Sequence, residues 1–228
     1  MQEEVENSPK NLIITEGKTD WKHLKQALNK LNLQDILGEI EFLEFEEDIE
    51  MGSSNLFNLC TSLSKLNQNK KIIAIFDRDE PAFIRKVSGG DGVSFRSWGN
   101  NVYSFTLPVP SHREATPHIS IEHYYKDEEI KLEDENGRRL YIGNEFSLTY
   151  GLHIFEEKIC KNKNKCGENS IQIIDNGVCR ISDESINIAL TKSRFANYIL
   201  TERPPFDNID FQSFLLVYEV VREILNAE

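Results

Sequence analysis

Acidic residues follow two short apolar segments of this sequence, and their side chains are the best suited to do chemistry. Residues 11–15 are followed by Glu16-Gly17-Lys18-Thr19-Asp20, and residues 71–76 are followed by Asp77-Arg78-Asp79. If Glu16, Asp77 and Asp79 converge, the three carboxylates repel one another and stay ionised together only around a cation. Hard oxygen ligands of this kind favour Mg²⁺ or Mn²⁺.

The elements that must position these acids are predicted by hydrophobic spacing. Short apolar runs predict β-strands, and leucines at helical spacing predict helices between them. We expect strands at 11–15, 40–45, 71–76 and 102–109, and helices at 19–31 and from about 53. Residues 85–101 are rich in glycine and polar residues, which is typical of an exposed loop. Alternation of strands and helices predicts an α/β fold with a parallel sheet.

In such a sheet, ligands bind beyond the carboxyl ends of the strands. The two acidic segments stand at two such ends, so we expect Glu16, Asp77 and Asp79 at one edge of the sheet. Gly17 would let the backbone turn sharply beside them. Any one of these acids alone is better explained as a turn former or a helix cap; it is their joint placement that indicates a site.

The order of these motifs resembles the TOPRIM domain of topoisomerases, bacterial primases, a nuclease of ribosomal RNA maturation, and nucleases of the OLD type. The resemblance rests on Glu16-Gly17-x-x-Asp20 and Asp77-x-Asp79 and covers residues 10–125. It implies a Rossmann-like fold of about four parallel strands flanked by helices, and Mg²⁺-dependent phosphodiester chemistry. Many members continue with glycine where this chain has Ala82, a departure that resembles OLD-like nucleases more than topoisomerases or primases.

OLD-like nucleases also carry a further glutamate and a late lysine, which match Glu122 and Lys192 here. The resemblance implies metal ligands at Glu16, Asp20, Asp77, Asp79 and Glu122. It implies catalytic roles for Glu16, Asp77, Asp79 and Lys192, with Glu16 as a general acid or base and Lys192 as a charge on the phosphate. An ordinary exposed lysine near a helix start explains Lys192 equally well.

The remainder of the chain, residues 126–228, is predicted to be an α+β extension that packs on the TOPRIM domain and ends in a helix at 207–226. Nucleic-acid contacts are predicted at Lys18, Lys161, Lys163 and Lys165, although a solvated loop explains the last three as well. The spacing of Cys160, Cys166 and Cys179 is wider than zinc sites usually show, so free buried thiols are favoured over zinc.

Composition excludes several protein classes. The formal net charge of −12 excludes a generally basic nucleic-acid coat. The sequence has no run of eighteen apolar residues, so no membrane span is predicted. The acidic N-terminal residues do not resemble a secretion signal. Four cysteines do not suggest a disulfide framework, so a cytoplasmic protein is predicted.

Together these features predict a metal-dependent endonuclease that cuts DNA or RNA, with transfer RNA among the substrates to consider. The resemblance to OLD-like nucleases implies a toxic effector of bacterial phage defence. No Walker motif occurs in the sequence, so a controlling ATPase or sensor would be a separate protein. A homodimer is left open, and two alternatives remain: a non-catalytic TOPRIM binding or regulatory module, and an RNA-maturation nuclease.

Overall fold

A computed structural model describes residues 9–45, 51–90 and 92–227. The chain forms two compact units. The first comprises the chain up to Tyr124 together with the segment from Phe211, and the second comprises Tyr125–Asp210. The first division lies next to the boundary predicted at residue 125. However, the segment from Phe211 groups with the first unit and not with the predicted extension.

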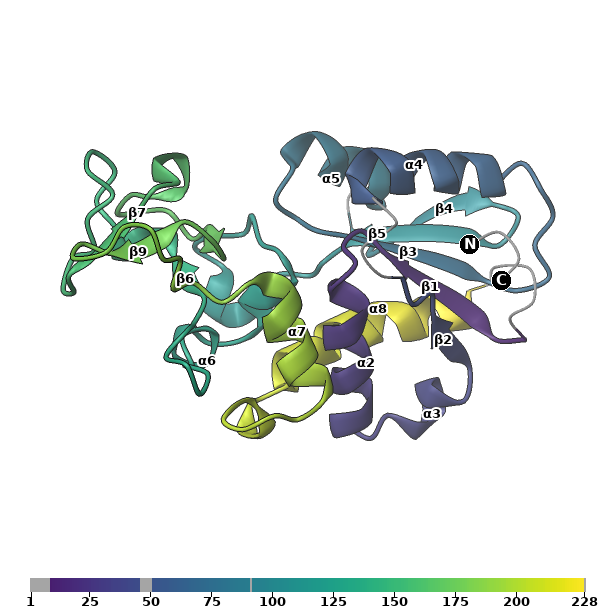
Figure 1. Cartoon of the computed structure of the whole chain (residues 1–228). Coiled ribbons are helices and arrows are strands. Elements are labelled where there is room, and N and C mark those ends of the chain that lie inside the picture. The colour runs from purple at the N-terminus through teal and green to yellow at the C-terminus, as the bar shows by residue number, and fades with distance from the viewer. Residues whose placement is uncertain (1–8, 46–50, 91, 228) are drawn as a thin grey trace. The chain divides into compact units, whose positions relative to one another are not determined.

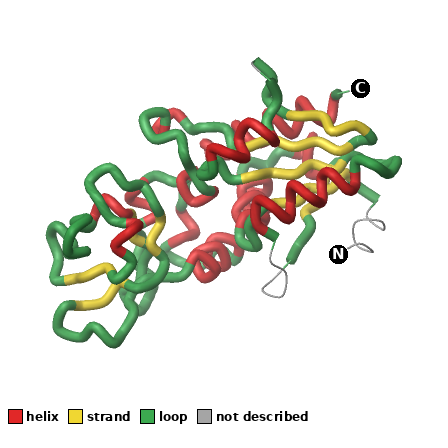
Figure 2. Tube along the Cα trace, turned by 90° about the horizontal axis from the view of Figure 1, so that it is seen from above, coloured by secondary structure: helices red, strands yellow, loops and turns green. Residues whose placement is uncertain are grey.

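The first unit is an α/β unit built on a five-stranded sheet (Figures 1 and 2). Its strands are β1 (Asn11–Thr15), β2 (Ile40–Phe42), β3 (Ile72–Phe76), β4 (Arg96–Gly99) and β5 (Val102–Thr106). Its α-helices are α2 (Asp20–Lys30), α3 (Gln34–Leu37), α4 (Gly52–Leu63), α5 (Pro81–Val87) and α8 (Leu215–Asn226). Three 3₁₀ helices complete it: η1 (Ser111–Arg113), η2 (Ile121–Tyr124) and η6 (Gln212–Phe214).

The strand order is β2-β1-β3-β5-β4, and the first four strands in this order are parallel. β3 and β5 are buried along their whole length, as expected for central strands covered on both faces. In Figure 1, α4 and α5 lie on one face of the sheet, and α2 and α8 lie on the other. The predicted α/β class with helix-flanked parallel strands is therefore confirmed.

The sheet has one strand more than predicted. β4 lies within the stretch 85–101, which we expected to be a loop, and pairs antiparallel with β5. Its residues alternate between half-buried and exposed, so it has no continuous apolar run. Asn100 and Asn101, which join β4 to β5, both have positive φ, of 49° and 61°. Two such residues form the hairpin turn that suits the twist of adjacent strands. The end of α5 also lies within the expected loop.

The C-terminal helix is shorter than predicted and belongs to the first unit. α8 begins at Leu215, not at residue 207, and is preceded by η6. Val217, Val221 and Ile224 are buried on its inner face. The Tyr218 hydroxyl donates to a backbone carbonyl of α2, and Lys71 Nζ donates to three carbonyls at the end of α8. These bonds attach α8 to elements more than a hundred residues earlier in the chain.

The second unit has little regular structure. Its helices are α6 (Asp127–Ile130), η3 (Gly143–Glu145), η4 (Lys163–Lys165), α7 (Lys192–Leu200) and η5 (Phe206–Asn208). Its strands are β6 (Tyr141–Ile142), β7 (Lys158–Cys160), β8 (Ile173–Ile174) and β9 (Val178–Arg180). The strands form two antiparallel pairs, β6 with β8 and β7 with β9. Because these strands are so short, side-chain packing and polar contacts must stabilise the unit.

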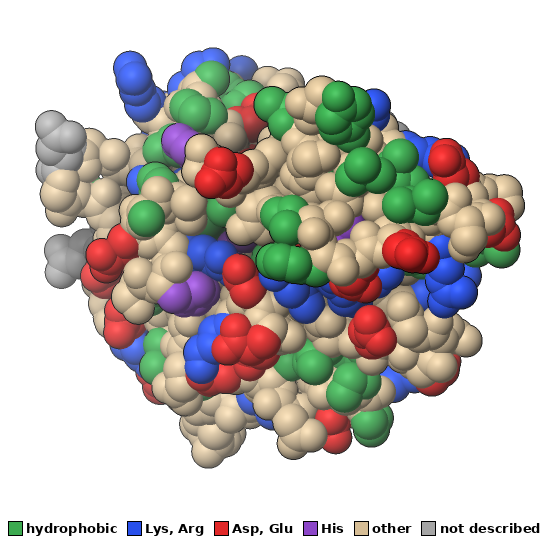
Figure 3. Space-filling model, turned by 90° about the vertical axis from the view of Figure 1, so that its left-hand side faces the viewer, with side chains coloured by type: hydrophobic (Ala, Val, Ile, Leu, Met, Phe, Trp, Pro, Cys, Tyr) green, Lys and Arg blue, Asp and Glu red, His purple; other side chains and the backbone are tan. Residues whose placement is uncertain are grey.

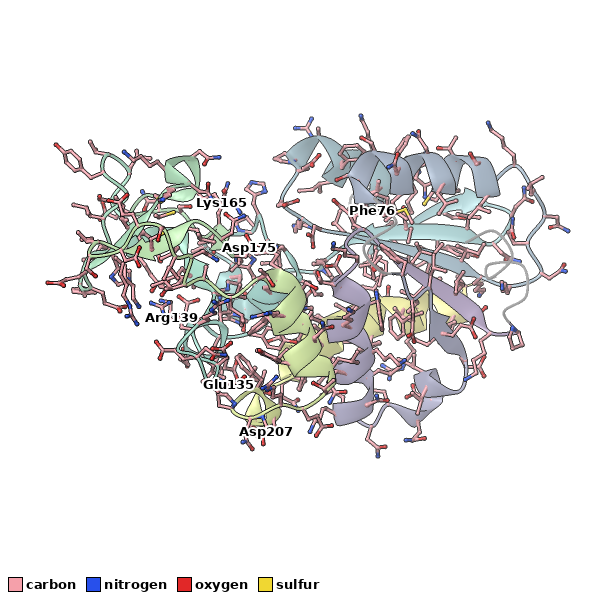
Figure 4. All side chains as sticks on the ribbon, in the orientation of Figure 1. Phe76, Glu135, Arg139, Lys165, Asp175 and Asp207 are labelled. Carbon is pink, nitrogen blue, oxygen red and sulfur yellow. The ribbon has the colours of Figure 1, made fainter. Side chains whose placement is uncertain are left out.

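An ion-pair network around the buried Arg139, which Figure 4 labels, lies within the second unit. The Arg139 guanidinium donates to both carboxylate oxygens of Glu145, over 3.2 and 2.7 Å, and stacks 3.8 Å from the centre of the Tyr141 ring. His153 Nε2 lies 3.4 Å from Glu145 Oε2. Although burial opposes ionisation of Glu145, hydrogen bonds from His153 and Arg139 outweigh it and lower the pKa of Glu145 to about 2.

Candidate active site

Two of the predicted acids are brought together by the pairing of β1 with β3. These strands are parallel neighbours, with Thr15 opposite Ile75, so Glu16 and Asp77 follow them at the same edge. The Asp77 backbone N–H donates to Glu16 Oε2 over 3.2 Å. The Ser53 hydroxyl, from the first turn of α4, donates to Glu16 Oε1 over 2.6 Å. Both carboxylate oxygens of Glu16 are therefore held by the protein.

Glu16 has a strongly altered acidity. Its pKa is raised from 4.5 to about 7, chiefly because burial disfavours the ionised form. The carboxylates of Asp79 and Asp20 raise the pKa further, while the hydrogen bonds from Ser53 and Asp77 oppose the rise. Glu16 therefore lies within electrostatic reach of both aspartates. A carboxyl group with a pKa near 7 can give or take a proton at neutral pH.

Asp20 closes the loop between β1 and α2. Its Oδ2 accepts a hydrogen bond of 2.7 Å from the Gly17 backbone N–H, and the Thr19 hydroxyl lies 3.3 Å from Oδ1. A Cβ atom at position 17 would lie 2.5 Å from Asp20 Oδ1, so a larger residue would have to displace the Asp20 carboxylate from its present position. The sharp turn that we expected does not require glycine at this position, because the φ of Gly17 lies outside the left-handed region.

The two remaining predicted site acids, Asp79 and Glu122, also lie near this edge. Asp79 is exposed, whereas Asp77 is half-buried. Glu122, in η2, is fully buried, and its Oε2 accepts a hydrogen bond of 2.7 Å from the Ser120 hydroxyl. The segment before η2 follows the end of β3, because the Arg78 N–H donates to the Ile119 carbonyl over 2.8 Å. Glu122 therefore belongs to the same end of the unit as Asp77.

The predicted lysines fall into two groups. Lys18 lies in the β1–α2 loop and is half-buried. Lys192 begins α7 in the second unit, so the structure places it in a different unit from the acids.

Two of the three lysines at 161–165 stabilise their own unit. Lys161 Nζ donates to the Glu184 carbonyl, and Lys165 Nζ donates to the Ile173 carbonyl and lies 3.7 Å from Asp175 Oδ1 (Figure 4).

The donor chemistry of the acidic edge suits a hard divalent cation, since carboxylate oxygens are its preferred ligands. The charge repulsion that raises the pKa of Glu16 is also the repulsion that such a cation would relieve. In the part of the chain that the structure describes, however, no three Asp, Glu, His or Cys side chains are already grouped as a metal site. The ligand assignments made from the sequence therefore remain predictions.

The three late cysteines do not face one another as a group. Cys160 and Cys166 belong to one buried core cluster, with Tyr141 and Phe146. Cys179 stands opposite Ile159 in the β7–β9 pair, and neighbouring positions on a strand face opposite sides. Cys179 and Cys160 therefore point to different faces. All three are buried free cysteines.

The sequence analysis did not identify two serines that belong to the site. Ser53 and Ser120 hold the carboxylates of Glu16 and Glu122. Ser53 lies 37 residues from its partner, and a serine at a helix start is commonly read only as a cap. Ser120 lies two residues before Glu122. The only feature of the sequence that could have indicated its role was a short polar turn.

Compared with protein-family models, with curated proteins and with solved structures, the chain matches none. Within the described ranges, no helix has the length and apolar character needed to cross a membrane.

Proposed function

We propose that this protein is a metal-dependent nuclease whose first unit is a TOPRIM-type catalytic domain similar to that of OLD-like nucleases. The observation that carries the proposal is the meeting of Glu16 and Asp77 at the carboxyl edge of β1 and β3, with the pKa of Glu16 raised to about 7. Sequence order, strand pairing and acidity all single out the same edge. The resemblance supplies the reaction class, and the geometry supports it.

Glu16, Asp77 and Asp79 would hold Mg²⁺ or Mn²⁺, with Asp20 and Glu122 as further ligands. When bound, the metal would stabilise negative charge on the scissile phosphate and activate water. The raised pKa of Glu16 in the metal-free unit supports a further role, in which its carboxyl group would exchange a proton with the attacking water or the leaving oxygen where it does not itself bind the metal. Ser53 and the Asp77 N–H orient that carboxyl group.

We propose DNA or RNA, including transfer RNA, as the substrate, and a role as the toxic effector of a bacterial phage-defence system in the cytoplasm. A separate ATPase would control it, since an unregulated nuclease endangers its own cell. The excess of acidic residues is consistent with weak spontaneous binding to nucleic acid. Lys18, Lys161, Lys163 and Lys165 would contact the substrate, and Lys192 would neutralise charge on the phosphate.

A non-catalytic binding module is the second candidate, and one observation favours it. Both oxygens of Glu16 and the carboxylate of Asp20 already accept hydrogen bonds from their own unit. Acids engaged in this way could stabilise a fold around a structural cation without cleaving a phosphodiester.

The test is cleavage of plasmid DNA and of total RNA with Mg²⁺ or Mn²⁺. Glu16→Gln and Asp77→Asn are compared with the wild type, and Glu114→Gln, which changes an exposed acid of the same unit, is the matched control. We expect the wild type and Glu114→Gln to cut while the two site variants do not. A preference for folded RNA over DNA would favour the RNA-maturation alternative.

Cleavage that survives in both site variants would refute the proposed active site. If the wild type does not cut, but Mg²⁺ raises its unfolding temperature and fails to raise that of Asp77→Asn, the non-catalytic module is the better description.

A further inference from the structure

The second unit contains a pocket of about 420 Å³ on which three arginines converge. Arg138 precedes the arginine of the buried network, Arg180 ends β9, and Arg194 lies in the first turn of α7. The three come from separate segments of the chain, so the fold itself brings their charges together. The volume falls within the range of pockets that hold small molecules.

These three arginines differ from the other arginines of the same unit. Arg139 and Arg203 form ion pairs with Glu145 and Glu135. By contrast, within the described part of the chain no ion pair and no side-chain hydrogen bond involves the guanidinium groups that line the pocket. Like charges without ion-pair partners repel one another, and a bound anion relieves that repulsion. Guanidinium groups match the oxygens of phosphate groups with paired hydrogen bonds.

One acid, Asp183, lines the pocket, and one of its two carboxylate oxygens is engaged within its own turn. Asp183 Oδ1 accepts hydrogen bonds from the Ser185 N–H over 3.0 Å and from the Ser185 hydroxyl over 2.6 Å. These bonds lower the pKa of Asp183, so it carries a negative charge at neutral pH. The pocket as a whole still has an excess of two positive charges, because three arginines face one aspartate.

An apolar wall stands beside the charges. Ile186 and Ile188 line the same pocket, and Ile186 is 55% exposed. An exposed isoleucine next to arginines suits a ligand that has both an apolar flat part and an anionic part. Figure 3 shows a face of the molecule on which hydrophobic and basic side chains lie close together.

We propose that this pocket binds a small phosphorylated molecule of nucleotide size, with its phosphates on Arg138, Arg180 and Arg194 and its base against Ile186. A small ligand is favoured over a nucleic-acid strand because acidic residues outnumber basic ones in residues 125–210. A long polyanion would meet those acids, whereas a ligand confined to the pocket would not. The inference is independent of the proposed nuclease activity.

The test is isothermal titration of the full-length protein with adenosine diphosphate and with inorganic pyrophosphate. EDTA is present throughout, so that no metal can bridge a phosphate to the acidic edge of the first unit. Arg180→Gln and Arg194→Gln remove single pocket charges from exposed positions. Arg203→Gln is the matched control, because it removes an arginine of the same unit that pairs with Glu135.

We expect saturable binding of both probes, weakened about tenfold or more by each pocket variant, as expected for loss of a charge-assisted hydrogen bond. Arg203→Gln should bind as the wild type does. Ile186→Ser should weaken binding of adenosine diphosphate and leave that of pyrophosphate unchanged. Circular dichroism verifies that each variant is folded.

Three results would overturn the proposal. The first is the absence of saturable binding of either probe to the wild type. The second is an equal loss of affinity in Arg203→Gln and in the pocket variants, which would show a general charge effect. The third is tighter binding of a single-stranded oligonucleotide than of adenosine diphosphate through the same arginines. That result would indicate a nucleic-acid site.

Discussion

The Glu16→Gln variant should be more stable than the wild type at pH 8 and no more stable at pH 5. The pKa of Glu16 is about 7 in the folded protein, against an ordinary value of 4.5. Folding therefore disfavours the ionised form of the Glu16 carboxyl group. The stability associated with its protonated form is present below pH 4.5 and is lost as the pH rises from 4.5 through 7.

The size of this effect follows from the same two values. The difference between the two pKa values corresponds to about 3 kcal/mol of free energy of unfolding. The wild type has lost this stability once the pH exceeds 7. Glutamine cannot ionise, so the variant avoids this loss. Its amide oxygen can still accept from Ser53, but its NH₂ group would face the Asp77 N–H, which costs about 1 kcal/mol. The net gain at pH 8 is about 2 kcal/mol.

Urea denaturation at pH 5 and pH 8, in EDTA, measures the difference. Glu114→Gln is the control, because Glu114 is exposed and its charge should contribute equally little at both values. The reasoning is refuted if Glu16→Gln and the wild type differ by the same amount at the two pH values. It is also refuted if the variant is the less stable protein at pH 8.

Two further substitutions test contacts in the two units. Gly17→Ala should destabilise the protein by about 1 kcal/mol, because the new Cβ would displace the Asp20 carboxylate and disturb the hydrogen bond it accepts from the residue 17 N–H; an unchanged urea midpoint would contradict this. Glu145→Gln should cost about 3 kcal/mol at pH 7, the lower end of the range for a broken buried pair, because the buried Arg139 guanidinium would keep only its ion pair with the more exposed Glu156. In the wild type, the stability from Glu145 should be lost as the pH falls from 4.5 toward 2, and acid titration followed by circular dichroism measures that loss.

The sequence predicted the buried strands well because burial on both faces leaves a continuous apolar run. β1 has the predicted bounds, and β3 begins one residue later than expected. β2 and β5 begin where predicted, but each ends three residues earlier, at Phe42 and Thr106. β4 was missed because an edge strand alternates polar and apolar residues within a glycine-rich stretch. Asn100-Asn101 was the available signal, since adjacent asparagines tolerate the positive φ of a tight hairpin.

The candidate site was predictable only where it depends on strand order. Placing Glu16 and Asp77 needs nothing more than two neighbouring parallel strands. The contact from Ser53 depends on how α4 packs, and no periodicity specifies that. Lys192 was assigned by resemblance alone, and it lies in the second unit. The pocket arginines were not predicted either, because three separate segments supply them.

The first unit is discontinuous in sequence, and this has a consequence for synthesis. The chain leaves that unit after Tyr124 and returns to it at Phe211. At about 5–20 residues per second, a ribosome needs several seconds to translate the intervening segment. Until α8 emerges, the unit lacks a helix whose Val217, Val221 and Ile224 are buried in its core. The unfinished chain must therefore keep apolar surface away from other nascent chains, so chaperones that bind nascent polypeptides should associate with it during that interval.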